Sequence, residues 1–327
     1  MKVGFCVVNY SELPVEKAVD IAVEHGYEAV ELPSYQDNGQ VDADALLQQS
    51  GAGAKSLAKS IRDRALDISA ISNHADSVLV MGPHGKDCNA VCQGTPEEQI
   101  AFGTNSLLRS AQLANAMEVP VVVAFTGVGN FGRFNDWPYP DGWKDELNDF
   151  AHRYAPILDK FKEYGVKLAF EPHPNNIMYD IYSCQQCIAA VDNHPNIGIN
   201  FDPANLMLTG ISVEAFVDEL KDRIFHVHAK DCEIVEHNLH RGGYWMYQGD
   251  WGAVNRSTRF RIPGWGSVNW KNVISELALI GYFGVFSYEH EDVLMSRADG
   301  TKKTIEFLKP LMIDAPYEGR TDKLFTR

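Results

Sequence analysis

The sequence has no long hydrophobic run and no basic segment. No stretch of eighteen apolar residues occurs along its 327 residues, which argues against a membrane-spanning helix. Lys and Arg number 29 against 44 Asp and Glu, so the formal net charge is −15. An acidic chain without a Lys/Arg-rich run does not favour binding to a phosphate backbone. We therefore expect neither a membrane nor a nucleic acid as partner.

Cysteine and glycine-rich motifs are also sparse. The six cysteines contain one C-x-x-C pair, Cys184 and Cys187, and no second pair follows at zinc-site spacing. We interpret this pair as structural, and the protein as reduced and cytoplasmic. No glycine-rich phosphate loop of either common type follows an early strand, which disfavours an open nucleotide-binding sheet.

Eight short β-branched or aromatic runs alternate with segments of helical period. The predicted strands are Lys2–Val8, Glu28–Leu32, Asp67–Ile71, Pro120–Phe125, Val166–Glu171, Ile197–Phe201, Ile224–His228 and Gly284–Tyr288. The predicted helices lie around 15–25, 43–65, 97–117, 143–164, 182–193, 212–222, 268–280 and 299–311. Strict alternation in eight units predicts an α/β protein, a (β/α)8 TIM barrel that forms a single domain over residues 1–327.

Local signals mark the ends of several predicted helices. Thr95 and Ser212 precede acidic first-turn residues, as capping side chains do. Gly26, Gly165 and Gly281 each stand between a helix and the next strand, where the chain enters left-handed backbone space. This repeated junction favours regular βα units.

Two long loops follow the C-terminal ends of strands, at 72–96 and 229–267. Barrel enzymes build their active sites at this end, so we expect both loops to line the pocket. The second loop is rich in aromatic residues that either bury one another or stack on a substrate: Trp245, Tyr247, Trp251 and Trp265.

Four consecutive predicted strands in the C-terminal half end on a possible metal ligand. These residues are Glu171, Asp202, His228 and Glu289. Any one of them alone is equally well explained as a helix cap or a solvated charge. In a closed barrel, however, the four strand ends meet at one mouth. Three carboxylates and one imidazole suit a divalent ion, with Mn²⁺ favoured over Mg²⁺, Co²⁺ or Fe²⁺.

Several longer motifs contain these residues. They are Glu-Pro-His-Pro (171–174), Asn-Phe-Asp-Pro-Ala-Asn-Leu (200–206), His-Val-His-Ala-Lys-Asp (226–231), Arg-Ile-Pro-Gly-Trp-Gly (261–266) and Tyr-Glu-His-Glu-Asp (288–292). Together they resemble the xylose-isomerase-like TIM barrels, a superfamily of sugar isomerases, sugar and sugar-phosphate epimerases, inosose dehydratases and endonuclease IV enzymes. The resemblance covers nearly the whole chain.

This resemblance implies one divalent metal ion held by Glu171, Asp202, His228 and Glu289. It also implies a sugar isomerase or epimerase acting on a small sugar or sugar derivative. In those enzymes the metal grips a carbonyl oxygen while carboxylates move a proton from the adjacent carbon. Glu171 and Glu289 would then be catalytic residues as well as ligands.

The sequence departs from the ketose 3-epimerases at two positions. Asn205 stands where those enzymes carry a substrate-contacting histidine, and Ile177 stands where they carry a glutamate. The alternative is a lyase that performs β-elimination on a 3-keto-glycoside, like the C-glycoside deglycosidases that pair with a small second subunit. Inosose dehydration follows the same logic. A homo-oligomer and a small partner subunit both remain open.

Further polar residues follow the predicted strands. His173 is the first choice for an additional catalytic base. The residues expected to contact substrate are His74, Thr126, Asn205, Lys230 and Arg261. We interpret His226 as a structural residue that points away from the site.

An endonuclease-IV-like enzyme is a weaker alternative. It would need three metal ions and further ligands on the early strands. Strands one and two end in Val8-Asn9 and Leu32-Pro33, which supply none.

Overall fold

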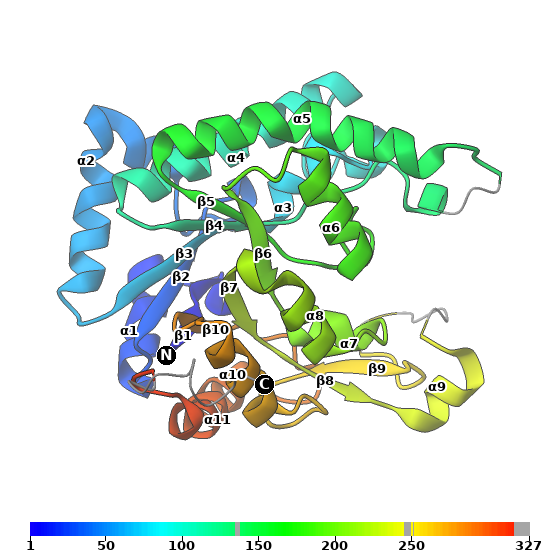
Figure 1. Ribbon diagram of the computed structural model, residues 1–327. Coiled ribbons are helices and arrows are strands. Elements are labelled where there is room, and N and C mark those ends of the chain that lie inside the picture. The colour runs from blue at the N-terminus through cyan, green and yellow to red at the C-terminus, as the bar shows by residue number, and fades with distance from the viewer. Residues whose placement is uncertain (135–137, 245–249, 251, 317–327) are drawn as a thin grey trace, which may run out of the picture.

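Eight parallel strands close into a barrel (Figure 1). The computed structural model describes residues 1–327 apart from 135–137, 245–249, 251 and 317–327. The strand order around the barrel is β1-β10-β7-β6-β5-β4-β3-β2. The strands are β1 (Lys2–Cys6), β2 (Ala29–Pro33), β3 (Asp67–Asn73), β4 (Val121–Ala124), β5 (Lys167–Phe170), β6 (Ile197–Phe201), β7 (Ile224–Ala229) and β10 (Val285–Tyr288). The single-domain TIM barrel predicted from the sequence is confirmed.

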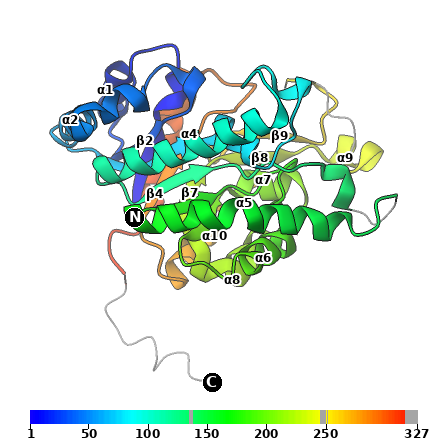
Figure 2. The ribbon, with the colours of Figure 1, turned by 90° about the horizontal axis from the view of Figure 1, so that it is seen from above.

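Helices cover the outside of this barrel (Figure 2). The longer ones are α1 (Val15–His25), α2 (Ala43–Arg62), α4 (Pro96–Ala116), α5 (Gly142–Tyr164), α6 (Ile181–Ala190), α8 (Val213–Leu220), α10 (Trp270–Leu279) and α11 (Arg297–Leu308). The backbone of α2 is non-helical at residues 48–51, so α2 is two successive helices. The short helices α3 (His74–Ser77) and α7 (Pro203–Leu208) follow β3 and β6 directly.

The helix ends have the local geometry that their residues predict. The Thr95 side chain accepts a hydrogen bond from Glu98 N, and the Glu98 side chain accepts one from Thr95 N, which completes a capping box. Gly26, Gly165 and Gly281 have φ values of 79°, 70° and 81°, so each supplies the left-handed turn that ends a helix.

Alternation along the strands separates two environments. Phe170 on β5 packs edge-on against Tyr154 of α5, with ring centroids 5.0 Å apart, and therefore faces the helices. Its neighbour Ala169 faces the other way and joins a small cluster with Val121 and Val123 inside the barrel. Successive strand residues point to opposite sides, so a residue that follows an outward aromatic points into the barrel.

The segment after β7 was expected to be a loop, but it contains further structure. Strands β8 (Asp231–Ile234) and β9 (Thr258–Arg261) form an antiparallel pair, and α9 (Glu236–Gly242) lies between them. Both views place this unit together at one side of the barrel (Figures 1 and 2). Residues 235–257, which include helix α9, separate the two strands, so no tight hairpin turn revealed the pairing in the local pattern.

None of the described helices combines the length and the apolar character required to cross a bilayer.

Gly127 and Gly26 offer a matched test of how the loops after β3 and β4 pack. Both have left-handed φ, 67° and 79°, so alanine strains either backbone by about 1–2 kcal/mol. At Gly26 an added Cβ meets no atom within 4 Å, whereas at Gly127 it would lie 2.7 Å from the Gly82 carbonyl oxygen. Urea denaturation of Gly127→Ala should show an additional loss of about 1–3 kcal/mol relative to Gly26→Ala. Equal losses would contradict this packing.

Candidate functional site

Four side chains from consecutive barrel strands meet inside the barrel mouth. Glu171 follows β5, Asp202 follows β6, His228 lies on β7 and Glu289 follows β10. One ligand atom from each of the four lies within 4.8 Å of all the others. The preceding residues Phe170, Phe201, Val227 and Tyr288 are fully buried. Strand alternation therefore aims all four candidate ligands inward.

His228 lies between two of these carboxylates. Its Nδ1 is 3.0 Å from Glu171 Oε2 and 3.3 Å from Glu289 Oε2. Asp202 is 1% exposed and Glu171 is 2% exposed. Burial by itself would lower the pKa of His228, but the carboxylates of Glu31, Glu171 and Glu289 hold that pKa well above its usual range.

Two buried polar atoms of the cluster, His228 Nδ1 and Asp202 Oδ2, make ion-pair contacts with Glu171 and Lys230 but no hydrogen bond of good geometry. Buried polar atoms without a well-formed hydrogen bond are rare in proteins, and an ion that binds beside them is one explanation. Three carboxylates and one imidazole match the donors that divalent ions of intermediate hardness prefer. The set therefore fits a divalent metal ion.

Lys230 places a positive charge beside the same carboxylates. Its Nζ lies 2.9 Å from Asp202 Oδ2, 2.9 Å from Glu289 Oε2 and 2.8 Å from Glu291 Oε2. The lysine is only 3% exposed. Burial opposes its charge, yet the surrounding carboxylates keep the pKa of its ammonium group well above the usual value. Glu291, which the sequence analysis did not single out, therefore belongs to this network.

The buried carboxylates differ in how readily they lose a proton. Burial raises the pKa of Asp202 to about 7, against the attraction of Lys230. Burial would also raise the pKa of Glu289, but Lys230 and His228 lower that pKa to about 2. The pKa of Glu171 likewise lies well below its usual range, because His228 and Lys230 outweigh the effect of burial.

Two asparagines orient Glu171. Asn200 Nδ2 donates to Glu171 Oε2 at 2.9 Å, and Asn205 Nδ2 donates to Glu171 Oε1 at 2.6 Å. Asn205 was expected to contact substrate, and the structure shows it bonded to a candidate ligand. Ile177 is fully buried, so this position presents no group to a substrate.

A cavity of about 430 Å³ opens above the candidate ligands. Its size falls in the range of small-molecule sites. Glu171, Lys230 and Glu289 line it together with further residues from several strands and loops, among them Tyr35, His74, Phe125, His173 and Glu291.

The two long loops contribute unequally to this cavity. Ser72, His74, Ala75 and Val78 come from the loop 72–96, whereas Lys230 represents the loop 229–267. Trp245, Tyr247 and Trp251 lie outside the described residues. Trp265 is 49% exposed, and its ring lies 5.8 Å from the guanidinium carbon of Arg261.

His173 lies in the cavity wall with a defined ring orientation. Its Nδ1 is 2.7 Å from the Pro174 carbonyl oxygen, which can only accept a hydrogen bond, so Nδ1 carries the proton. Burial lowers the pKa of His173 and favours the neutral ring. A neutral ring protonated at Nδ1 leaves Nε2 with a free lone pair. His74 also faces the cluster, with Nε2 3.2 Å from Glu171 Oε2.

Thr126 and Arg261 do not line this cavity. Thr126 is 1% exposed and its hydroxyl donates to Asn176 Oδ1 at 3.3 Å. Arg261 donates from Nε to Asp292 at 2.9 Å and pairs with Glu233 at 3.2 Å. Both side chains are bonded within the protein, so a contact with substrate stays a prediction.

Strand β2 carries a buried acidic side chain ahead of its Leu32-Pro33 end, because Glu31 points into the barrel and contacts both His226 and His228. One interpretation of the sequence is wrong, because His226 does not point away from the site. It is two residues before His228 on the same strand, so both rings face inward, with centroids 5.8 Å apart. The Val-Glu-Leu run at 30–32 was a detectable signal, since a charge within an apolar strand requires a buried partner.

Lys230→Met tests the charge balance of this network. Removing one partner of a buried ionic cluster leaves uncompensated charge and typically costs about 3–5 kcal/mol. We expect a loss of that order in the free energy of unfolding of metal-free protein, measured by urea denaturation. Lys302→Met is the control, because Lys302 is exposed and lies 3.9 Å from Glu306. Similar values for the two variants would contradict the network.

The chain is similar to several known proteins. A 3-dehydroshikimate dehydratase of Bacillus anthracis is 23% identical over 301 residues, which cover 90% of this chain and 94% of the relative. The structure of an L-ribulose 3-epimerase superimposes with a TM-score of 0.63 at 18% identity, covering 95% of this chain and 94% of the other. The structure of the IolI protein with a bound zinc atom gives a TM-score of 0.64 at 16% identity, covering 98% and 100%.

These structural likenesses show a common fold, and a sequence match shows the family. The xylose isomerase-like TIM barrel family matches residues 19–311, which is most of the chain. The protein therefore belongs to the xylose isomerase-like TIM barrel family.

Proposed function

We propose that this protein is a divalent-metal-dependent enzyme that removes a proton from the carbon next to a ketone in a neutral polyhydroxylated substrate. The observation that carries the proposal is the cluster of four candidate ligands, two of which, Glu171 and Glu289, line the same cavity as His173. Glu171, Asp202, His228 and Glu289 would hold the ion. Mn²⁺ is the first ion to test, and a zinc-containing structure among the similar folds makes Zn²⁺ the second.

The ion would polarise the ketone and stabilise the negative charge that develops when the adjacent C–H bond breaks. Residues around the candidate ligands fix their orientation before this step. Asn200 and Asn205 fix both oxygens of Glu171, so this ligand does not rotate. Lys230 lines the cavity, and its ammonium group holds the carboxylates of Asp202, Glu289 and Glu291 in place.

His173 is the base that the geometry favours. Its Nδ1–H is bonded to the Pro174 carbonyl, and Nε2 is left to accept a proton. Glu171 and Glu289 are less free, because Asn200, Asn205 and Lys230 already bond their oxygens. After His173 takes the proton, the C–H electron pair forms a C=C bond and the β-hydroxyl leaves with that proton as water. The balanced reaction is a dehydration, which is the lyase alternative in its simplest form.

The charge of the cavity favours a neutral substrate. Four carboxylates line it, from Glu31, Glu171, Glu289 and Glu291, against the single ammonium group of Lys230. No arginine is among the described lining residues, and Arg261 is bonded to Asp292 and Glu233. With the ion bound, little positive charge remains for a substrate carboxylate or phosphate. An inosose or a keto-sugar therefore fits better than an acidic ketone.

An isomerase or epimerase is the second candidate. Glu171 and Glu289 both reach the cavity, as a mechanism with two carboxylates requires. In this case His173 would orient substrate, and the proton would return to carbon without loss of water.

Metal loading followed by incubation in D2O distinguishes the two reactions. Protein stripped with a chelator and reloaded with Mn²⁺ should convert a neutral inosose or keto-sugar to a product lighter by one water, detected by mass spectrometry. An isomer of unchanged formula that has gained deuterium would instead establish the second candidate. Asp202→Asn should bind the ion poorly and show neither change. Conversion of 3-dehydroshikimate or a sugar phosphate in preference to neutral compounds would contradict the proposed substrate class.

Replacement of His173 tests its role as base. His173→Gln should lower kcat by about 10²–10⁴-fold while the metal content stays unchanged, because the general base is lost and the ligands remain. His152→Gln, at an exposed position of α5, should leave kcat unchanged. A His173→Gln enzyme with normal kcat would return the base role to Glu171 or Glu289.

A further inference from the structure

We propose that Glu31 is a positioning residue that fixes the ring of His228, so that Nδ1 is the nitrogen presented to the metal ion. The inference rests on the metal centre of the proposed function and goes beyond it, because Glu31 is not one of the four ligands. Glu31 is a buried carboxylate that has no other role in the proposed reaction.

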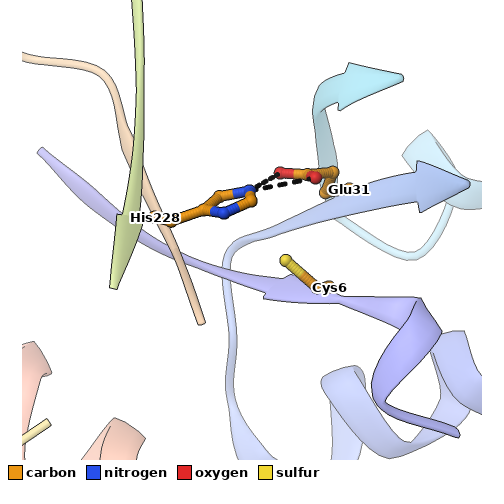
Figure 3. Close-up of side chains that lie close together, drawn as sticks. All are labelled: Cys6, Glu31 and His228. Atoms are coloured by element: carbon orange, nitrogen blue, oxygen red, sulfur yellow. Dashed lines mark hydrogen bonds and ion pairs between the residues drawn. The ribbon is translucent and has the colours of Figure 1, made fainter. Parts of the chain in front are cut away.

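Glu31 and His228 face each other across the barrel interior (Figure 3). Glu31 belongs to β2 and His228 to β7, and these strands are not neighbours in the barrel. His228 Nε2 lies 3.2 Å from both Glu31 Oε1 and Glu31 Oε2. The opposite ring nitrogen, Nδ1, lies 3.0 Å from Glu171 Oε2. The ring thus has one nitrogen toward Glu31 and the other toward the candidate ligands.

This arrangement decides which nitrogen carries a proton when the ring is neutral. A carboxylate only accepts hydrogen bonds, so Nε2 must be the donor toward Glu31. Nδ1 then has the free lone pair that a metal ion needs. A histidine ligand whose second nitrogen donates to a carboxylate is held in orientation and is a stronger electron donor, and loss of such a partner typically weakens metal binding about 10–100-fold.

Glu31 is itself held in place by His226, which lies deeper in the barrel. His226 Nε2 lies 2.8 Å from Glu31 Oε2 and 3.1 Å from the hydroxyl oxygen of Ser287. Glu31 is 2% exposed and His226 is 2% exposed, so water does not compete strongly for these contacts. The order Ser287, His226, Glu31, His228 is therefore a continuous set of contacts that leads from the barrel core to the metal centre.

Cys6 lies beside the same pair (Figure 3). Its Sγ and the ligand atoms of Glu31 and His228 lie within 4.8 Å of one another, so the three residues form a possible second ion site. An ion there would have to replace the Nε2 proton that bonds Glu31. We therefore assign Glu31 to His228 and expect one metal ion per chain.

Metal affinity measures the contribution of Glu31. Competition with a chromophoric chelator gives the Kd for Zn²⁺ or Mn²⁺, and elemental analysis gives the stoichiometry. Glu31→Met removes the acceptor and should raise Kd about 10–100-fold. Glu31→Gln keeps an acceptor oxygen and should give an intermediate value. Glu28→Gln changes a carboxylate just before β2 that accepts from Val3 N, and should leave Kd within twofold of wild type.

The wild-type protein gives a second readout that does not depend on a folded variant. Long-range ¹H–¹⁵N correlation of the Zn²⁺-loaded protein should show His228 protonated at Nε2 and metal-bound at Nδ1. The opposite assignment, a stoichiometry of two ions, or a folded Glu31→Met protein with wild-type Kd would each overturn the inference. If the wild-type protein binds no divalent ion, the metal centre fails together with it. If it binds one and only the Glu31 variants behave normally, the proposed function stands and the role of Glu31 fails.

Discussion

Closure of the barrel is the constraint on which the site depends. Eight parallel strands that close on themselves bring their carboxyl ends to one mouth, so residues far apart in the sequence become neighbours. Phe170, Phe201 and Tyr288 are buried on the outer side of the barrel wall. Because successive strand residues point to opposite sides, the residue after each of them points into the barrel. The same packing that stabilises the fold therefore aims the functional groups.

The cost of this arrangement is electrostatic. Several carboxylates lie within a few ångströms of one another at almost no exposure to water, which proteins tolerate only with opposing charge nearby. Lys230 and His228 supply that charge in the protein itself, and a divalent ion would supply more. This balance of charges also explains why we favour a neutral substrate. A cavity whose positive charge is already engaged by its own carboxylates suits a neutral hydroxylated ketone.

The sequence predicted the part of the site that lies at strand ends and missed the part inside the barrel. Glu171, Asp202, His228 and Glu289 each stand where an apolar run stops, so their shared position was visible. Glu31 lies within an apolar run, and its partner His226 comes from a strand nearly 200 residues later. The pairing of β8 with β9 was hidden for a similar reason, since no local turn joins them.

The sequence by itself determined the eight strand–helix units, the helix caps and the residue types at each strand end, because these depend on short-range periodicity and backbone preferences. Tertiary structure alone decided which of those residues touch. It placed Lys230 among the carboxylates and turned Asn205 toward Glu171. It also joined Glu31 to His228, since contacts across a closed barrel depend on strand order and register rather than on neighbours in the chain.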